Sequence, residues 1–124
     1  MPAAAPYIEL HAHSAFSFLD GASTPLELAG AAAALDYPAL ALTDHDGIWG
    51  SMEFAHCAVG LGLRPITGAE LTVRLDPGGD GPKTQGGLEF SARQRGQVAH
   101  LTLLAEDGDG YRNLCRLLTA AHAH

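Results

Sequence analysis

Strand-like and helix-like segments alternate along this sequence, and that alternation limits the folds open to it. Residues 7–13 alternate polar and apolar side chains, with Ile8 and Leu10 opposed to Glu9 and His11, which is the two-residue period of a strand. The apolar segments that follow are separated from it, and from each other, by helix signals. Strands that alternate with helices predict βαβ units, a parallel sheet and right-handed crossovers.

Two helices are predicted between the first three strands. Thr24 fits the N-cap of the first helix, with Pro25 at the first helical position and Glu27 three residues after the cap to close a capping box. This helix is expected to run to about Leu35. The second helix is expected over about residues 49–60, where apolar side chains share one face at three- and four-residue spacing.

Three further strands and a last helix complete the pattern. Residues 39–47, ALALTDHDG, form an apolar run that ends in turn residues, as expected of a buried parallel strand. Residues 64–73, RPITGAELTV, predict a third strand. Residues 98–105, VAHLTLLA, predict a fourth strand of the parallel type, and the last helix is expected from about Gly110.

A segment rich in glycine and proline interrupts this order. Residues 76–87, DPGGDGPKTQGG, predict a flexible surface loop or the tip of a hairpin. Residues 88–92, LEFSA, fit a strand that returns beside residues 71–75. No internal repeat or domain boundary is visible, so residues 1–124 are expected to form a single domain.

Charge and composition narrow the class of partner. The formal net charge is −7, so the bulk surface should repel a phosphate backbone, and any contact with nucleic acid must be local or supplied by another part. The opening MPAAAPY has no basic region and no eighteen apolar residues follow one another, so we expect a cytoplasmic protein without a membrane partner. Cys57 and Cys115 fall in predicted helices, which favours reduced cysteines and leaves a bridge open.

Ionisable side chains gather where the predicted strands end. One pair of histidines ends the first strand, an Asp-His pair ends the second, and a glutamate lies near the end of the third. In parallel α/β folds the carboxyl ends of the strands share one mouth, where chemistry collects. With an aspartate of the first loop, these residues are His11, His13, Asp20, Asp44, His45 and Glu70.

This set has the composition of a metal site. Alternate residues of a strand point the same way, so His11 and His13 can offer two imidazoles to one ion. Imidazole with carboxylate suits Zn, Mn or Fe, whereas an all-oxygen set would indicate Mg or Ca. With Glu70 as a bridge, a mixed set of this kind can hold two or three ions.

Each feature also has an ordinary structural explanation. An H-x-H pair alone fits surface or core histidines, Asp20 with Gly21 fits a turn, and Glu70 can pair with an arginine. TDHDG fits a strand-to-helix turn in which an aspartate caps the helix. If these ordinary explanations all held, three unrelated polar features would have to occur by coincidence at the ends of three different strands. We therefore predict a metal site. His100, which precedes an apolar run, fits a ligand and a core histidine equally well on local grounds.

Four ordered motifs resemble a known family. They are ELHAHSAFSFLDGAS, ALALTDHDGIWGSMEFA, PITGAELTV and HLTLLAEDGDGYRNLCRLLTAAH, which together cover nearly the whole chain outside the Gly-rich segment. The chain resembles the N-terminal part of the PHP domain (polymerase and histidinol phosphatase type) that opens the bacterial C-family replicative polymerases. SFLDGAS and GAELTV look most like the error-prone branch, which serves in damage tolerance.

The resemblance implies an α/β fold, a distorted TIM-like β/α barrel of which this chain forms roughly the first half. The mouth of such a barrel holds two or three divalent ions. Asp44 fits a partner that fixes the imidazole of His45, and Glu70 matches the family's metal-bridging carboxylate. The metal ligands implied are His11, His13, Asp20, His45, Glu70 and His100, and the catalytic residues are Glu70 and Asp44.

Length is the departure from the family. A complete barrel of this kind needs about 250 residues, and the family's later ligands, including an Asp-x-His pair, would follow residue 124. The chain is therefore expected to be a piece of a long polymerase, or to pair with a second copy or a partner that covers its open sheet edges.

For a complete barrel, the resemblance implies metal-assisted phosphoester hydrolysis, as proofreading of a primer 3′ end or removal of pyrophosphate. DNA would be reached through the rest of the polymerase, and the isolated chain is expected to be inactive. Two alternatives stay open. The fold can serve as a scaffold without catalysis, or the chain can be a small stand-alone phosphatase.

Overall fold

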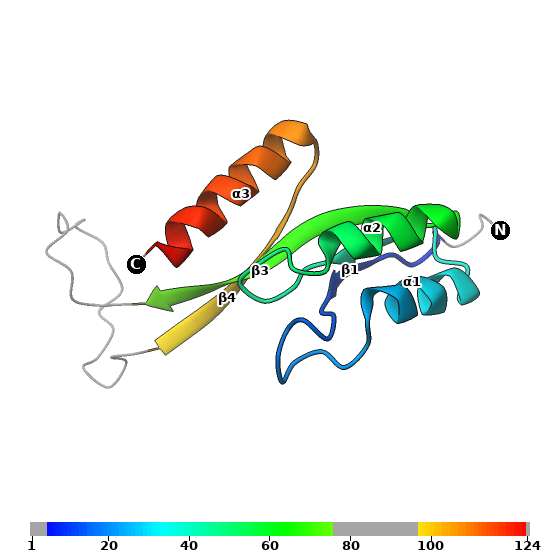
Figure 1. Ribbon diagram of the computed structural model, residues 1–124, viewed down its shortest axis with the longest axis horizontal. Coiled ribbons are helices and arrows are strands. Elements are labelled where there is room, and N and C mark those ends of the chain that lie inside the picture. Colours follow the sequence, from blue (N-terminus) through cyan, green and yellow to red (C-terminus); the bar gives the residue numbers. More distant parts are fainter. Residues whose placement is uncertain (1–4, 76–96, 124) are drawn as a thin grey trace, which may run out of the picture.

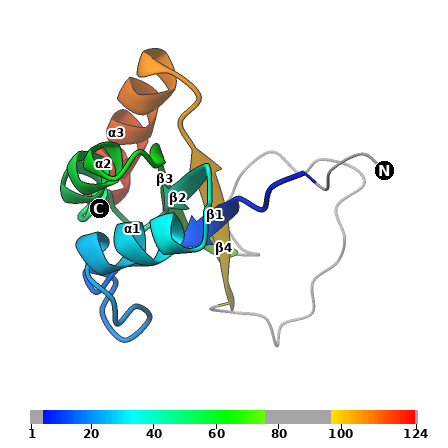
Figure 2. The same ribbon diagram turned by 90° about the vertical axis from the view of Figure 1, so that its right-hand side faces the viewer.

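A mixed sheet carries three helices on one of its faces (Figure 2). The computed structural model describes residues 5–75 and 97–123. The predicted loop at residues 76–87 and the predicted strand at residues 88–92 lie outside the described residues. In chain order the elements are β1 (Glu9–Ala12), α1 (Pro25–Ala34), β2 (Ala39–Leu42), α2 (Ser51–Gly60), β3 (Arg64–Leu75), β4 (Gln97–Leu104) and α3 (Gly108–His122).

The first three strands form the parallel part of the sheet, as the sequence predicts. The strand order is β1-β2-β3-β4, with β1 and β3 both parallel to β2. α1 connects β1 to β2 and α2 connects β2 to β3, which gives two consecutive βαβ units. Together with β4, these elements make a half-barrel of the predicted α/β class.

The prediction of a parallel fourth strand is wrong. β4 pairs antiparallel with β3 over eight residue pairs, from Gly68 with Leu104 to Leu75 with Gln97. Its largely apolar sequence indicated a strand buried on both faces, but Val98 and Leu101 are about half exposed. Figure 1 shows β3 and β4 continuing together beyond the ends of β1 and β2.

The helices cover the sheet through two apolar clusters. Leu40 and Leu42 of β2 pack under α1 and α2 against Phe54, Ala29 and other buried side chains. Further along, α3 packs on the β3 residues of the second cluster, which comprises Ala69, Leu71, Leu114 and Leu118. Because neighbouring residues of a strand point to opposite faces, Glu70 and Thr72 lie on the face that no described helix covers.

Local signals set the helix ends. Thr24 caps α1 in the predicted capping box, with the Glu27 side chain accepting from the Thr24 backbone. α2 begins at Ser51, two residues later than predicted, because residues 47–50 turn to bring the Gly50 N–H onto a buried carboxylate. α3 begins at Gly108, slightly earlier than predicted, with Asp107 as its N-cap.

Two further expectations concern disulfide bonds and membrane-spanning helices. Cys57 and Cys115 are both free, which settles the open choice in favour of unbridged cysteines. Across residues 5–75 and 97–123, no helix has the length and apolar character to cross a bilayer.

Two glycine substitutions should have opposite effects on stability. At Gly30, inside α1, an added Cβ meets nothing within 4 Å, so Gly30→Ala should raise the free energy of unfolding by about 0.5–1 kcal/mol. At Gly68, a Cβ would lie 2.4 Å from the Leu103 carbonyl oxygen, so Gly68→Ala should lower it by about 1–3 kcal/mol. Urea denaturation measures both, and a Gly68→Ala chain as stable as the native one would contradict the close approach of β3 and β4.

Candidate metal centre

The helix-free face of the sheet carries a buried carboxylate at its centre. Glu70 lies midway along β3, and its side chain is 9% exposed. Its backbone N–H donates to the Asp44 carbonyl at 3.0 Å, and its carbonyl accepts the Asp46 N–H at 2.7 Å. This short parallel bridge sets His45 directly opposite Glu70, so the turn that follows β2 delivers an imidazole to the carboxylate.

Four imidazoles surround the Glu70 carboxylate. His11 Nε2 lies 2.7 Å from Oε1, while His45 Nδ1 lies 3.0 Å and His13 Nε2 3.3 Å from Oε2. His100 Nδ1 is 3.9 Å from Oε2. Because His100 stands opposite Thr72 in the antiparallel register, its side chain emerges on the same face as Glu70. The structure thus brings together five of the six residues that the sequence predicts as ligands.

The five residues form two groups that share Glu70. His11, His13 and Glu70 make one group, and His45, Glu70 and His100 make the other. In each group, one ligand atom per residue lies within 4.8 Å of the others. A carboxylate has two oxygens and can bridge two ions, so this arrangement suits two divalent ions about a common glutamate.

One polar atom in the cluster tests whether a cation fits. His13 Nε2 is buried and has no hydrogen-bond partner among the described residues, although Glu70 Oε2 is only 3.3 Å away. A buried nitrogen without a partner costs about 1–3 kcal/mol. A cation between this nitrogen and the carboxylate would give both a partner, so the residues present fit a metal ion.

The pKa shifts of Glu70 and His45 follow from the contact between them. Burial acts to raise the pKa of Glu70, but hydrogen bonds from His45 and His11 and the nearby imidazoles outweigh it and lower that pKa. The hydrogen bond with Glu70 raises the pKa of His45, against the opposite effect of burial. The carboxylate is therefore kept ionised, which is the form that binds metal.

Asp44 has a different role from the one predicted. Its carboxylate is 1% exposed and accepts hydrogen bonds from the Ser14 N–H and hydroxyl, the Ser17 hydroxyl and the Gly50 N–H, at 2.7–3.0 Å. None of the hydrogen bonds of Asp44 goes to the imidazole of His45, so the expected contact is corrected. Asp44 instead ties the loop after β1 to the start of α2.

Asp20 remains outside the cluster. It is exposed, belongs to neither group of ligands, and its backbone N–H donates to the Ser17 carbonyl. Its negative charge nevertheless contributes to the raised pKa of His45. Ligation by Asp20 stays a prediction.

Sequence reasoning missed four residues that support the ligands. Ser14 and Ser17 bond to Asp44, and the Ser17 hydroxyl also accepts the His45 N–H at 2.8 Å. Asp46 and Thr72 contact the far side of the His45 ring. The second aspartate of TDHDG was visible, but these contacts depend on the bridge between His45 and Glu70, which no local pattern shows.

Comparison with protein families shows a match over most of the chain. The model of the PHP domain matches residues 9–124, which includes every residue of the cluster.

Curated relatives are DNA polymerases. The chain is 50% identical over 117 residues to an error-prone DNA polymerase of Mycolicibacterium paratuberculosis, covering 94% of this chain and 10% of that protein. It is 38% identical over 116 residues to a DNA polymerase III subunit alpha of Buchnera aphidicola, covering 94% of this chain and 9% of that protein. The chain therefore spans about a tenth of the length of the curated relatives it matches.

Solved structures share the fold. An amidohydrolase from Chromobacterium violaceum, with bound sulfate and no metal, superposes with a TM-score of 0.57 at 30% identity, over 88% of this chain and 32% of that one. A putative metal-dependent phosphoesterase from Bifidobacterium adolescentis superposes with a TM-score of 0.52 at 33% identity, over 56% of this chain and 23% of that one.

Substitution of the buried Asp44 should destabilise the whole fold. Asp44→Asn replaces an oxygen that accepts hydrogen bonds with an NH₂ group facing donors, and should lower the free energy of unfolding by about 3 kcal/mol or more. Asp109→Asn is the matched control, because Asp109 is exposed and forms an ion pair with Arg112 at the surface, and this substitution should change the free energy of unfolding by less than about 1 kcal/mol. Urea denaturation measures the free energy of unfolding of both variants. An Asp44→Asn chain as stable as the Asp109→Asn chain would contradict the prediction.

Proposed function

The chain belongs to the PHP domain family, and from this premise we propose that it is the N-terminal PHP segment of an error-prone bacterial DNA polymerase that binds divalent metal ions. The observation that carries the proposal is the Glu70 carboxylate set among four imidazoles in two groups. The sequence similarity to error-prone polymerases over 94% of the chain supports the larger context.

The donor set limits the choice of metal. Each group offers two imidazoles and a share of one carboxylate, a set that suits Zn, Mn or Fe rather than Mg or Ca. Two ions about Glu70 account for all five clustered residues. A third ion would need ligands beyond these five, and Asp20 is the candidate within this chain.

The proposed reaction is metal-dependent hydrolysis of a phosphoester in the complete barrel. The likeness to a putative metal-dependent phosphoesterase and to an amidohydrolase with bound sulfate supports a site that accepts a tetrahedral anion. When bound, divalent ions supply Lewis acidity that activates water and stabilises the leaving oxygen. Removal of nucleotides from a DNA 3′ end, or cleavage of pyrophosphate, is the finer proposal.

The residues of the chain define how a substrate approaches. His11 and His100 are each about half exposed, whereas Glu70 and His13 are mostly buried beneath them. Glu70 and His13 would therefore hold the ions from the buried side, and a phosphate would approach past the exposed His11 and His100. The net charge of −7 gives phosphate no general attraction, so its binding relies on the cations themselves.

A scaffold without catalysis is the second candidate. Glu70 already accepts hydrogen bonds from His11 and His45 in the structure, so the cluster is held together by contacts of its own. Under this alternative the metal would serve stability alone. The third reading, a small stand-alone phosphatase, gains no support from relatives that are about ten times longer than this chain. DNA contacts, self-association and a cytoplasmic location likewise remain proposals.

Metal titration tests the centre directly. The native chain should bind Zn²⁺ or Mn²⁺ tightly in isothermal titration, and Glu70→Gln should weaken binding at least about 100-fold because both groups lose their shared ligand. Glu53→Gln, an exposed change of the same chemistry on α2, should leave the affinity unchanged. A native chain that gives no heat with either ion would refute the metal proposal.

A double variant separates enzyme from scaffold. In the complete polymerase, His11→Ala with Glu70→Gln should reduce metal-dependent hydrolysis of a 3′-terminal phosphodiester at least about 100-fold, while the melting temperature of the PHP domain changes by only a few degrees. Glu53→Gln again serves as the control. Loss of folding in a protein that has no hydrolytic activity to begin with would instead support the scaffold.

A further inference from the structure

Asp46 is held in an unusual backbone conformation beside the candidate metal centre. Its φ of +52° lies in the left-handed region, which among residues other than glycine is adopted most often by asparagine, aspartate and histidine. Its N–H donates to the Glu70 carbonyl at 2.7 Å, and its own carbonyl accepts a hydrogen bond from His122 Nε2 at 2.7 Å. Contacts from β3 and α3 thus fix Asp46 on both sides.

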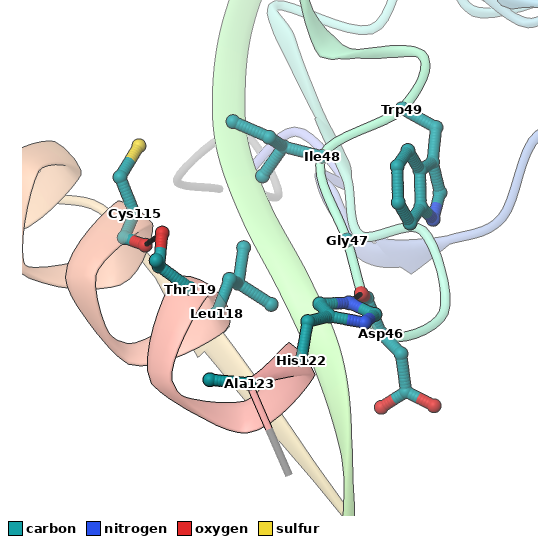
Figure 3. Close-up of a pocket in the computed structure, with 9 residues that line it drawn as sticks. All are labelled: Asp46, Gly47, Ile48, Trp49, Cys115, Leu118, Thr119, His122 and Ala123. Atoms are coloured by element: carbon teal, nitrogen blue, oxygen red, sulfur yellow. Dashed lines mark hydrogen bonds between the residues drawn. The ribbon is translucent and has the colours of Figure 1, made fainter.

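The contact from α3, made by His122, lies at the wall of a pocket. The pocket has a volume of about 480 Å³ and lies between α3 and the turn that follows β2, with Trp49 and His122 on its walls. Figure 3 shows the His122 ring beside the backbone of Asp46, with the Asp46 carboxylate directed away from that ring. The backbone of Asp46 therefore forms part of the pocket wall, while its side chain points away from His122.

The Asp46 carboxylate is directed to Thr72 of β3. Its Oδ1 accepts the Thr72 N–H at 2.6 Å, and its Oδ2 accepts the Thr72 hydroxyl at 2.8 Å. Two hydrogen bonds from one residue fix the orientation of the carboxylate. A hydroxyl has one proton, so the Thr72 oxygen that donates to Asp46 is left with lone pairs only, and can accept but not donate a second bond.

The free side of the Thr72 hydroxyl faces His45. His45 Nε2 lies 3.1 Å from Thr72 Oγ1 and 3.2 Å from Asp46 Oδ2. Both of these oxygens can only accept, so the contact is favourable only when Nε2 carries a proton. The other nitrogen, Nδ1, faces Glu70 Oε2 at 3.0 Å. With no ion bound, Nδ1 donates to that carboxylate from an imidazole protonated on both nitrogens, and a divalent ion would take the place of the Nδ1 proton while Nε2 keeps its own.

We propose that Asp46, acting with Thr72, is a positioning residue that keeps the proton of His45 on Nε2 and leaves Nδ1 free to bind a divalent ion with Glu70. The inference rests on the proposed metal site and deepens it, because it assigns the coordinating atom of His45 and the residues that select it. When one ring nitrogen of a histidine binds a metal, the other nitrogen commonly donates to a carboxylate or to a hydroxyl that a carboxylate orients. That hydrogen bond holds the ring in one tautomer and one orientation.

The decisive variant is Asp46→Asn, tested by zinc binding and by the ring signals of His45. Asparagine tolerates a φ of +52°, but its amide has only one accepting oxygen, so the Thr72 hydroxyl loses the acceptor that orients it. Zinc affinity, measured against a chromophoric chelator, should fall about 10–100-fold. In the zinc-loaded native chain, nitrogen-15 correlation spectra should show a His45 Nε2–H protected from solvent exchange, and Asp46→Asn should abolish it.

Asp36→Asn is the matched control. Asp36 also has a positive φ, of +56°, and the substitution removes the same charge at an exposed loop position remote from the cluster. Zinc affinity and the His45 signal should both stay as in the native chain.

Thr72 provides an independent pair of variants. Thr72→Val removes the hydroxyl and keeps the backbone N–H to Asp46, so it should lower zinc affinity about tenfold and weaken the Nε2–H signal. Thr72→Ser keeps the hydroxyl and should behave as the native chain within about twofold. If Asp46→Asn fails to fold, the Val and Ser variants decide the question alone.

The outcomes separate this inference from the function on which it rests. Native zinc binding that Asp46→Asn and Thr72→Val leave unchanged, with Nε2–H still protected, would overturn the positioning role while the metal site stands. A native chain that binds no zinc would overturn both.

Discussion

Burial of one carboxylate is the constraint on which the site depends. Glu70 is in the middle of a strand, mostly removed from water, where an unpaired charge would cost several kcal/mol, on the order of the stability of a small domain. Hydrogen bonds from His11 and His45 outweigh the effect of burial and keep its pKa low. The chain thus holds a negative charge on an inner face and surrounds it with four imidazoles, an arrangement that a cation completes.

The parallel strands bring this chemistry together, and Asp44 holds the connections in place. β1 and the turn after β2 each deliver histidines toward β3, and the bridge between His45 and Glu70 sets their separation. Asp44 bonds to Ser14, one residue after His13, and to Gly50 before α2. A single buried side chain therefore joins two of the four segments that carry ligands, the loop after β1 and the turn after β2, and this hydrogen-bond network limits how far the two can move apart.

Local patterns predicted what depends on local physics. The alternation around His11 and the capping box at Thr24 identified β1 and α1, because strand period and helix capping are properties of adjacent residues. The direction of β4 was not predictable from its apolar run, since pairing with β3 depends on partners far away in sequence. The hydrogen bonds of Asp44, Asp46 and Thr72 were missed because their partners are also far away in sequence. Asp44 and Asp46 follow a strand, where a short polar residue is typical of an ordinary turn.

The outer histidines leave one side of the cluster accessible. Here each group supplies three residues, one of them shared, and its outer histidines are about half exposed. Ions held by this cluster would be reached from the helix-free side. Because the formal net charge is −7, the surface offers a phosphate little general attraction, and cations at the cluster would supply the positive charge that binds it, so the acidic surface would favour selectivity for that position.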